Sequence, residues 1–197
     1  MKRLYLLRHG QTEYNLRKVV QGRCDSPLTG LGEEQARAAG AWLAARGVRP
    51  DRVVSSPLGR AMGTARIVAG ILGFEGPVEA EEGIVERAYG EFELRPFSEL
   101  PYDVWDPTDE IERYGGEGNG RVRARMAAAL EADIRADGVG CLLAVSHGSA
   151  SRQFIACTLG LDGNFREKLP NCAVMSFDFD EVAGRFEFLG VHDPAAE

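Results

Sequence analysis

The sequence has no apolar run long enough to cross a membrane and no excess of positive charge. A membrane-spanning helix needs about 20 consecutive apolar residues, and every apolar run here is far shorter. The 197 residues carry a formal net charge of −7, which makes a nucleic acid, itself a polyanion, an unsuitable partner. We therefore expect neither a membrane nor a nucleic acid among the partners. The chain enters its first predicted strand almost at once, so we also expect no signal peptide.

Cysteine is scarce too. The four cysteines, Cys24, Cys141, Cys157 and Cys172, show no CxxC or zinc-type spacing. Cys141 and Cys157 lie in apolar runs, where a free cysteine packs as a small core residue. We therefore expect a reduced, cytoplasmic protein.

The rest of the composition, 44% hydrophobic and 27% charged residues, is that of an ordinary globular protein. Short apolar runs predict buried strands of a parallel sheet, at residues 4–7, 52–54 and 141–145. Helical periodicity predicts helices, over residues 29–47, 56–73, 119–138 and 149–159. Alternating residues predict an antiparallel C-terminal hairpin at one edge of the sheet, over 174–179 and 185–189. The expected fold is one α/β domain spanning residues 1–197, a three-layer sandwich with helices on both faces of a mainly parallel central sheet.

Capping residues mark the ends of two predicted helices. Thr29 is a suitable N-cap for the first, and Gly47 is a suitable C-cap. For the second helix, the sequence predicts Ser56 as the N-cap and Pro57 at the first helical position. The stretch between the first strand and Thr29 has no helical period and is expected to be a loop.

A capping insertion is predicted over residues 74–118, which are rich in glycine, proline and acidic residues and have weak periodicity. Residues 87–117 hold nine acidic and three basic side chains. A long irregular insertion in a compact domain is often a functional cap, although a solvated surface excursion fits the same composition. We expect Tyr102 and Trp105 to pack the cap rather than to line a pocket.

Three predicted strands end in polar residues. The first ends at Arg8-His9-Gly10, the second at Ser55-Ser56, and the third at Ser146-His147-Gly148. Parallel strands share their carboxyl edge, where open α/β sheets hold their ligands. Arg60 lies in the first turn of the next helix and can reach this edge, although a solvated helix-surface arginine fits its position equally well. Two arginines and two histidines predict a site for an anion with several oxygens, above all phosphate.

Phosphate chemistry at this edge follows from the side chains available. Nearby guanidinium groups would repel a cation, so we expect no metal and no cofactor. A neutral imidazole is a competent nucleophile, and a backbone carbonyl on its far nitrogen would fix the tautomer. N–H groups near Gly10 would add to the anion site. His147, if protonated, would donate to the transferred group. The leaving oxygen needs an acid, for which Glu86 competes with Glu82, Glu91 and Glu93.

The sequence resembles the histidine phosphatase superfamily, the phosphoglycerate mutase-like proteins, over most of its length. Four motifs in order carry the resemblance: Arg8-His9-Gly10 with Asn15, Ser55-Ser56-Pro57 with Arg60, Glu86 with Gly90, and Ser146-His147-Gly148. Gln21-Gly22 and Asn171 also fit the family pattern.

The resemblance implies roles for these residues. His9 would be the phosphorylated nucleophile, Arg8, Arg60 and His147 the phosphate pocket, and Glu86 the proton donor that later activates water. We expect substrate contacts from a further group of residues in the same motifs: Asn15, Gly10, Gln21, Gly22, Arg23 and Gly148.

The family includes phosphatases and mutases. Family mutases carry a longer, more basic insertion, whereas the one here is short and acidic, which disfavours a strongly anionic substrate. We therefore expect a phosphatase that hydrolyses a small organic phosphate monoester through a phosphohistidine. The alternatives are a 2,3-bisphosphoglycerate-dependent phosphoglycerate mutase and a non-catalytic module that binds a phosphorylated ligand. The substrate and the oligomeric state, including a homodimer, stay open.

Overall fold

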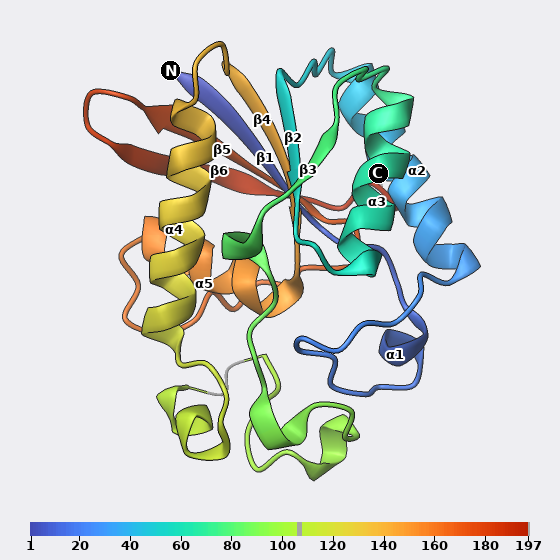
Figure 1. Cartoon of the computed structure of the whole chain (residues 1–197), viewed down its shortest axis with the longest axis vertical. Helices are drawn as coiled ribbons and strands as arrows, with labels where there is room; N and C mark the ends of the chain where they lie inside the picture. The colour runs from blue at the N-terminus through green and yellow to red at the C-terminus, as the bar shows by residue number, and fades with distance from the viewer. Residues whose placement is uncertain (106–107, 197) are drawn as a thin grey trace.

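A six-stranded sheet with helices on both faces forms the body of the protein (Figure 1). The computed structural model describes residues 1–105 and 108–196. The sheet has the order β3-β2-β4-β1-β5-β6. The strands are β1 (Lys2–Arg8), β2 (Arg52–Ser55), β3 (Val78–Ala80), β4 (Cys141–Ser146), β5 (Val174–Asp180) and β6 (Arg185–His192). Among the helices in the described ranges, none is long and apolar enough to cross a membrane.

The strand pairing confirms a mainly parallel sheet with an antiparallel hairpin at one edge. Strands β1, β2, β3 and β4 pair in parallel, whereas β5 runs antiparallel to β1, and β6 to β5. The carboxyl ends of β1, β2 and β4 therefore lie at one edge of the sheet. The residues that follow them are His9, Ser56 and His147.

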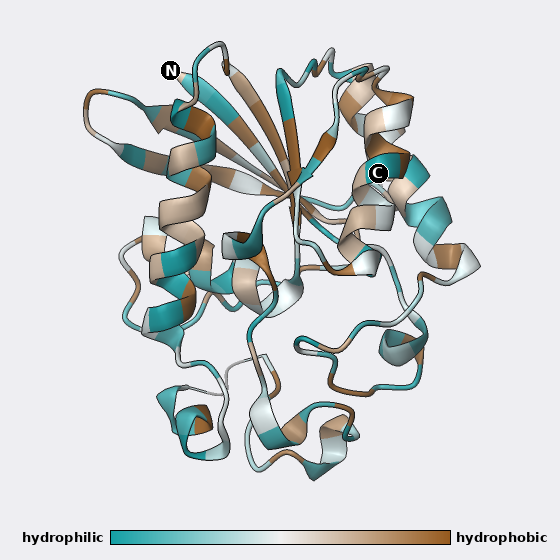
Figure 2. Ribbon diagram, viewed as in Figure 1, coloured by the Kyte–Doolittle hydropathy of each residue, from teal (hydrophilic) through white to brown (hydrophobic). Residues whose placement is uncertain are grey.

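Two helices cover each face of the sheet. Helices α2 (Gly30–Ala45) and α3 (Gly59–Ile71) lie on one side, and α4 (Asn119–Arg135) and α5 (Gly148–Thr158) lie on the other (Figure 1). Each face of the sheet has its own apolar core, and successive residues of β1 point to opposite faces. Leu6 packs with α4 and α5, whereas Leu7 packs with α2 and α3. Figure 2 shows the resulting apolar strands between the two helix layers. The predicted three-layer sandwich is confirmed.

The first predicted helix is capped as expected, but the second is not. The Thr29 hydroxyl accepts the Gly32 N–H at 3.0 Å, and Gly47 adopts the left-handed φ of +71° that suits a residue after the C-cap. Helix α3, however, begins at Gly59, with Leu58 as N-cap and no side-chain cap bond from it. The Ser56 hydroxyl is instead hydrogen-bonded to a ring nitrogen of His147 at 2.8 Å.

The segment over residues 8–28 is not wholly a loop. It holds the single-turn helix α1 (Glu13–Leu16), in which Thr12 and Asn15 form a capping box. Four residues are too few to show a helical period, so the capping pair is the only local signal.

The insertion is more ordered than its composition suggests. Its first part is the edge strand β3, which is too short and too polar to give a strand pattern. Four short 3₁₀ helices follow: η1 (Glu82–Ile84), η2 (Gly90–Phe92), η3 (Phe97–Glu99) and η4 (Asp109–Tyr114). They enclose a small apolar cluster of Tyr89, Phe92 and Ile111 with Val20. The insertion is therefore a cap with its own core, docked on the loop before α2.

The start of α2 packs directly on the backbone that follows β1. A Cβ atom on Gly32 would lie 2.0 Å from the Gln11 carbonyl oxygen, and one on Gly10 would lie 2.3 Å from the Gly32 carbonyl oxygen. These contacts are between backbone atoms, so neither can be relieved by a side-chain movement.

We therefore expect Gly32→Ala to destabilise the protein by about 3 kcal/mol, because the added methyl group forces two backbone segments apart. Urea denaturation of the wild type and the variant measures this change. Gly30→Ala is the matched control, since a Cβ there has no atom within 4 Å, and it should leave stability within about 1 kcal/mol of the wild type. Equal stability of the two variants would contradict the packing argument.

Candidate active site

The two histidines at the strand ends lie against each other. Their ring centroids are 5.1 Å apart at an interplanar angle of 61°, and both residues are buried. The His9 N–H bonds to the Ser146 carbonyl oxygen at 3.0 Å, so the β1–β4 pairing continues up to the histidine itself. The predicted convergence of these two strand ends is confirmed.

The His9 ring is held in one tautomer. Its Nδ1 lies 2.7 Å from the Gly10 carbonyl oxygen, which can only accept a hydrogen bond, so Nδ1 carries the hydrogen and Nε2 keeps its lone pair. The Gly10 N–H donates to the Thr64 hydroxyl at 3.0 Å. Gly10 thus orients the histidine, and its own N–H is not one of the exposed N–H groups expected near it.

Two buried arginines flank His9, and backbone carbonyls hold them. Arg8 Nη1 donates to the Leu169 carbonyl oxygen at 2.6 Å. The Arg60 guanidinium donates to the carbonyl oxygens of Gly22 and Cys24, each at 2.8 Å. The Nε atoms of both arginines have no hydrogen-bond partner within the described ranges. Arg60 is only 1% exposed, so it is a site residue and not a helix-surface arginine.

Asp25 fixes Arg60 at the start of α3. Its carboxylate accepts the N–H groups of Gly59 and Arg60 and lies 3.2 Å from Arg60 Nη1. An acidic group suits the positive end of a helix, and here it replaces the missing local cap. Asp25 is 34 residues before Gly59, so no local pattern in the sequence marks this role.

Burial and the arginines keep the histidines neutral. Burial, and after it the positive charge of Arg60, lowers the pKa of His9 well below the usual value of 6.5. The same two causes lower the pKa of His147. Burial also lowers the pKa of Arg8 to about 10, so that guanidinium stays charged near neutral pH. A protonated His147 is therefore not the resting form, and the neutral ring has one N–H to donate.

Among the competing carboxylates, Glu86 is the one at the site. It lines the cavity beside His9 and Arg60, whereas Glu82, Glu91 and Glu93 do not. Its oxygens accept three backbone N–H groups, from Arg87 at 2.8 Å, Ala150 at 2.9 Å and Ser149 at 3.2 Å. Two of these donors belong to the first turn of α5, so the helix start holds the carboxylate in place.

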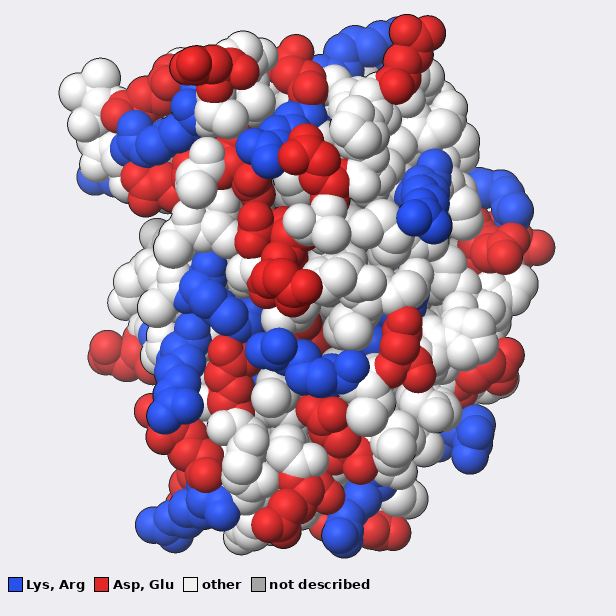
Figure 3. Space-filling view, viewed as in Figure 1, with Lys and Arg blue, Asp and Glu red and all other residues white. Residues whose placement is uncertain are grey.

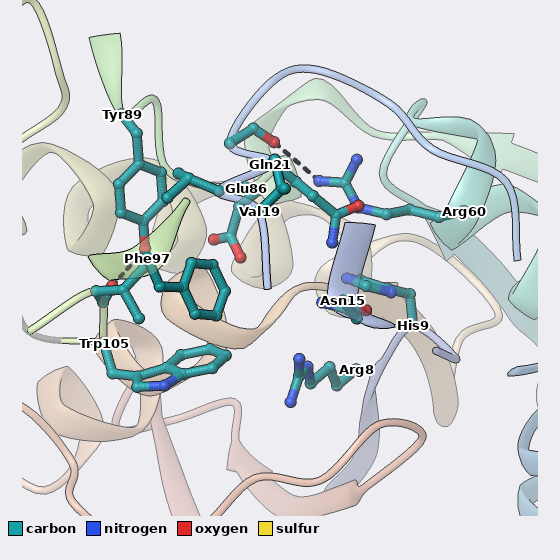
Figure 4. A pocket seen from close by; sticks show the side chains of 13 residues that line it. Arg8, His9, Asn15, Val19, Gln21, Arg60, Glu86, Tyr89, Phe97 and Trp105 are labelled. Carbon is teal, nitrogen blue, oxygen red and sulfur yellow. Dashed lines mark hydrogen bonds between the residues drawn. The ribbon is translucent and has the colours of Figure 1, made fainter. Parts of the chain in front are cut away.

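A cavity opens between the arginine–histidine cluster and the cap. In Figure 4, the rings of Tyr89, Phe97 and Trp105 lie on one side, and Arg8 and His9 lie on the other. The remaining lining residues are Asn15, Val19, Val20, Gln21, Gly22, Arg60, Glu86 and Val104. His147 contacts the His9 ring but is not among these lining residues.

The two cap aromatics have different roles. Tyr102 packs on Phe92, with ring centroids 5.6 Å apart, as predicted. Trp105 instead lines the cavity, and its indole lies 5.1 Å from the Arg8 guanidinium carbon, so the expectation that it only packs the cap is wrong. The reason is long-range: Trp105 reaches Arg8 only because the cap folds back over the sheet edge.

The predicted contact residues are mostly brought together. Asn15, Gln21 and Gly22 line the cavity, and Gly148 lies against Trp105, where a Cβ would come within 2.7 Å of the indole. Arg23 is not brought to the cavity, because its guanidinium is turned outward to Glu117 at 3.4 Å.

Several lining residues gave no signal in the sequence. Val19, Phe97 and Val104 are apolar residues in irregular segments, and nothing local distinguishes them from packing residues. No three His, Cys, Asp or Glu side chains gather as a metal-binding group in the part of the chain that the structure describes. The side chains at the site can thus hold an oxyanion, attack it through His9 Nε2 and exchange a proton through Glu86.

Comparison with known proteins gives consistent matches. The model of the histidine phosphatase superfamily (branch 1) matches residues 4–192. A protein of Yersinia enterocolitica described as probable phosphoglycerate mutase GpmB is 31% identical over 190 residues, which cover 92% of this chain and 86% of that protein.

Two solved structures are similar over nearly the whole chain. A phosphoserine phosphatase of Entamoeba histolytica in complex with phosphoserine has a TM-score of 0.83 and 26% identity, and the match covers 98% of both chains. A mycobacterial glucosyl-3-phosphoglycerate phosphatase has a TM-score of 0.79 and 26% identity, over 98% of this chain and 99% of that one. By its sequence match and by the fold and strand-end histidines described above, the chain belongs to branch 1 of the histidine phosphatase superfamily.

Proposed function

We propose that the protein is a phosphatase that needs no metal and hydrolyses a small organic phosphate monoester through a phosphohistidine on His9. The observation that carries this proposal is the neutral His9 ring, held by the Gly10 carbonyl at 2.7 Å between two buried arginines. Its free Nε2 can attack phosphorus while the guanidinium groups bind the phosphoryl oxygens. Glu86 lies in the same cavity as a proton carrier.

In the first step, His9 Nε2 forms a bond to phosphorus and the ester P–O bond breaks. The leaving alkoxide takes a proton from Glu86, which enters this step in its protonated form. In this proposal the Ser56 hydroxyl donates to Nε2 of His147. The hydrogen of the neutral His147 ring is then on Nδ1, which has no hydrogen-bond partner in the described structure. That N–H would bind a phosphoryl oxygen.

In the second step, water attacks the phosphohistidine. The water oxygen forms a bond to phosphorus as the P–N bond breaks, and Glu86 takes one proton from the water molecule. Inorganic phosphate leaves, His9 is again neutral, and Glu86 again holds the proton that it gave to the alkoxide. Atoms and charges balance over the two steps, and no metal is required.

The composition of the cavity wall favours a phosphatase over a mutase. Besides Glu86, the residues that the cap contributes are Tyr89, Phe97, Val104 and Trp105, and none of these is a cation. Arg87 is fully buried and turned away, with its guanidinium bonded to Ser149, Asn119 and the Glu117 carbonyl. A mutase must bind a bisphosphorylated intermediate, and this wall offers it no additional cation.

The acidic residues of the cap play a smaller part than their number suggests. None of those described between residues 87 and 117 lines the cavity. Glu117, for example, pairs with Arg125 at 2.7 Å. In Figure 3 the acidic side chains of the cap, at the bottom of the view, are interspersed with basic ones. The absence of a cation from the cap's part of the described lining, and not a negative field, is therefore the feature that argues against a strongly anionic substrate.

A phosphoglycerate mutase is the second candidate, because the Yersinia relative bears that description. Two similar solved structures are described as phosphatases, and they support the phosphatase proposal. The two activities differ in the acceptor of the phosphoryl group, which is water in one and a second hydroxyl group in the other.

We expect His9→Ala to lower kcat for an aryl phosphate by at least about 10³-fold, since the nucleophile is lost. Wild-type protein quenched during turnover should carry one alkali-stable phosphoryl group on His9, measured by mass spectrometry. His192→Ala, which changes the histidine stacked on Trp42 away from the site, should keep wild-type activity. Formation of 2-phosphoglycerate from 3-phosphoglycerate only when 2,3-bisphosphoglycerate is added, without release of inorganic phosphate, would favour the mutase instead.

Glu86→Gln should lower kcat for an alkyl phosphate by about 10²- to 10⁴-fold, because the alkoxide needs a proton. The loss should be much smaller for p-nitrophenyl phosphate, whose leaving group is stable as an anion. Steady-state kinetics with both esters measure the difference, and Glu82→Gln, an acidic neighbour outside the cavity, is the control. An equal loss with both esters would argue against Glu86 as the proton donor.

The lowered histidine pKa values predict that the protein stays active at mildly acidic pH. Because His9 stays neutral below pH 6.5, kcat/KM should persist as pH falls from 7 to about 5.5, where an ordinary histidine is largely protonated. Stability should fall over the same range, since the unfolded chain binds protons below its pKa of 6.5 and the folded chain does not. If kcat/KM, corrected for ionisation of the substrate, already declines at or above pH 6.5 as the pH is lowered, this prediction is contradicted.

A further inference from the structure

Arg125 stands outside the cavity at His9, yet its guanidinium contacts the segment that carries Glu86. The residue belongs to α4 and is not among the described residues that line the cavity, so it has no part in the two chemical steps proposed above. Its Nη1 donates to the carbonyl oxygens of Gly83 at 2.9 Å and Val85 at 2.7 Å. One nitrogen atom thus ties together two backbone groups of the turn that leads into Glu86.

A carboxylate on the other side of Arg125 fixes the orientation of that guanidinium. Glu117 accepts Arg125 Nε at 2.7 Å and Nη2 at 2.8 Å, a bidentate pair that holds a planar guanidinium in one orientation. The two side chains are only 19% and 13% exposed. Together with the bonds to the turn, these contacts use four of the five N–H groups of the guanidinium.

The backbone of Glu117 holds the chain just after Glu86. Its N–H donates to the Ala88 carbonyl oxygen at 2.9 Å, and its own carbonyl oxygen accepts Nη1 of Arg87 at 2.7 Å. Arg125 and Glu117 therefore form one unit that contacts the chain on both sides of Glu86.

The place of the Glu86 carboxylate depends on this backbone. Its bonds to the N–H groups of Ser149 and Ala150, at 3.2 and 2.9 Å, can form only while the backbone of Glu86 keeps its distance from α5. Proton transfer needs the two heavy atoms within about 3 Å of each other, and a displacement of about 1 Å can lower a rate by about 10²-fold.

We propose that Arg125 is a positioning residue for Glu86, acting through the carbonyl oxygens of Gly83 and Val85 and held by Glu117. This inference rests on the proposed function, since it concerns the proton donor of that reaction. A purely structural role for Arg125 would slow the turnover of every substrate alike. A positioning role instead slows those substrates whose leaving group needs a proton.

The test compares Arg125→Lys with the wild type on glycerol 3-phosphate and on p-nitrophenyl phosphate. Lysine keeps the charge, but its single nitrogen cannot span a carboxylate and two carbonyl oxygens. We expect kcat/KM for glycerol 3-phosphate to fall at least about tenfold, and kcat/KM for p-nitrophenyl phosphate to stay within about twofold of the wild type. Equal losses with the two esters, or no loss with either, would overturn the proposal.

Arg123→Lys is the matched control. Arg123 is also a half-buried residue of α4, and its guanidinium also holds two carbonyl oxygens, those of Leu161 and Gly163 at 2.9 and 2.6 Å. Its substitution should leave the ratio of the two kcat/KM values unchanged. If Arg125→Lys does not fold, Glu117→Gln takes its place and should shift that ratio in the same direction by at least about threefold, because one of the two bonds to Arg125 is lost.

A double variant shows whether Arg125 acts through Glu86. When Glu86→Gln is already present, Arg125→Lys should lower kcat/KM for glycerol 3-phosphate by less than about twofold more, since the group that it positions has lost its proton. A further loss as large as that in the single variant would overturn the proposal.

Amide hydrogen exchange separates this inference from the proposed function, because it needs no turnover. The N–H groups of Ser149 and Ala150 lie in the first turn of α5, where the helix offers them no acceptor, and the Glu86 carboxylate accepts both. Their exchange should be at least about tenfold faster in Arg125→Lys than in the wild type, and unchanged in Arg123→Lys. If neither ester is hydrolysed, the proposed function fails. Faster exchange would then keep the positioning role, and unchanged exchange would overturn it.

Discussion

The site depends on the parallel pairing of β1 and β4. Their register places Arg8 opposite Ser146, and the bond from the His9 N–H to the Ser146 carbonyl at 3.0 Å extends that pairing by one residue. The two strands thus end at the same level, and each is followed by a histidine. A shift of one residue would turn these side chains to opposite faces of the sheet, so the register that aligns the core also assembles the site.

Two guanidinium groups, those of Arg8 and Arg60, are buried beside these strand ends, with electrostatic consequences. Arg8 and Arg60 are held largely by backbone carbonyls, which satisfy N–H groups without cancelling the positive charge. An anion that enters the cavity therefore meets charge that water does not screen. Burial, and after it the charge of Arg60, lowers the pKa of His9 and of His147, so the arginine that attracts phosphate also helps to keep the nucleophile unprotonated.

The cap forms one wall of the cavity. Its own apolar cluster includes Val20 of the loop before α2, and Phe97 and Trp105 of the cap line the cavity, with Trp105 against the Arg8 guanidinium. Glu93 strengthens the docking, because its carboxylate accepts the N–H groups of Arg23 and Tyr89 at 3.0 Å each. The cap is thereby tied to the loop that supplies carbonyls to Arg60, and a change in the cap can reach the phosphate pocket through that loop.

The sequence by itself determined the sheet except for its short edge strand β3, and it determined the two histidines at the strand ends. Buried strands, the capped helix after Thr29, and the histidine–glycine pairs at His9 and His147 all follow from neighbours within a few residues, which local patterns record. Tertiary structure alone decided how Asp25 caps α3, how Ser56 serves His147 instead of its helix, and which carboxylate faces His9. It also decided that Trp105 lines the cavity. These contacts join residues tens of positions apart, and no periodicity or capping signal in the chain encodes such distances.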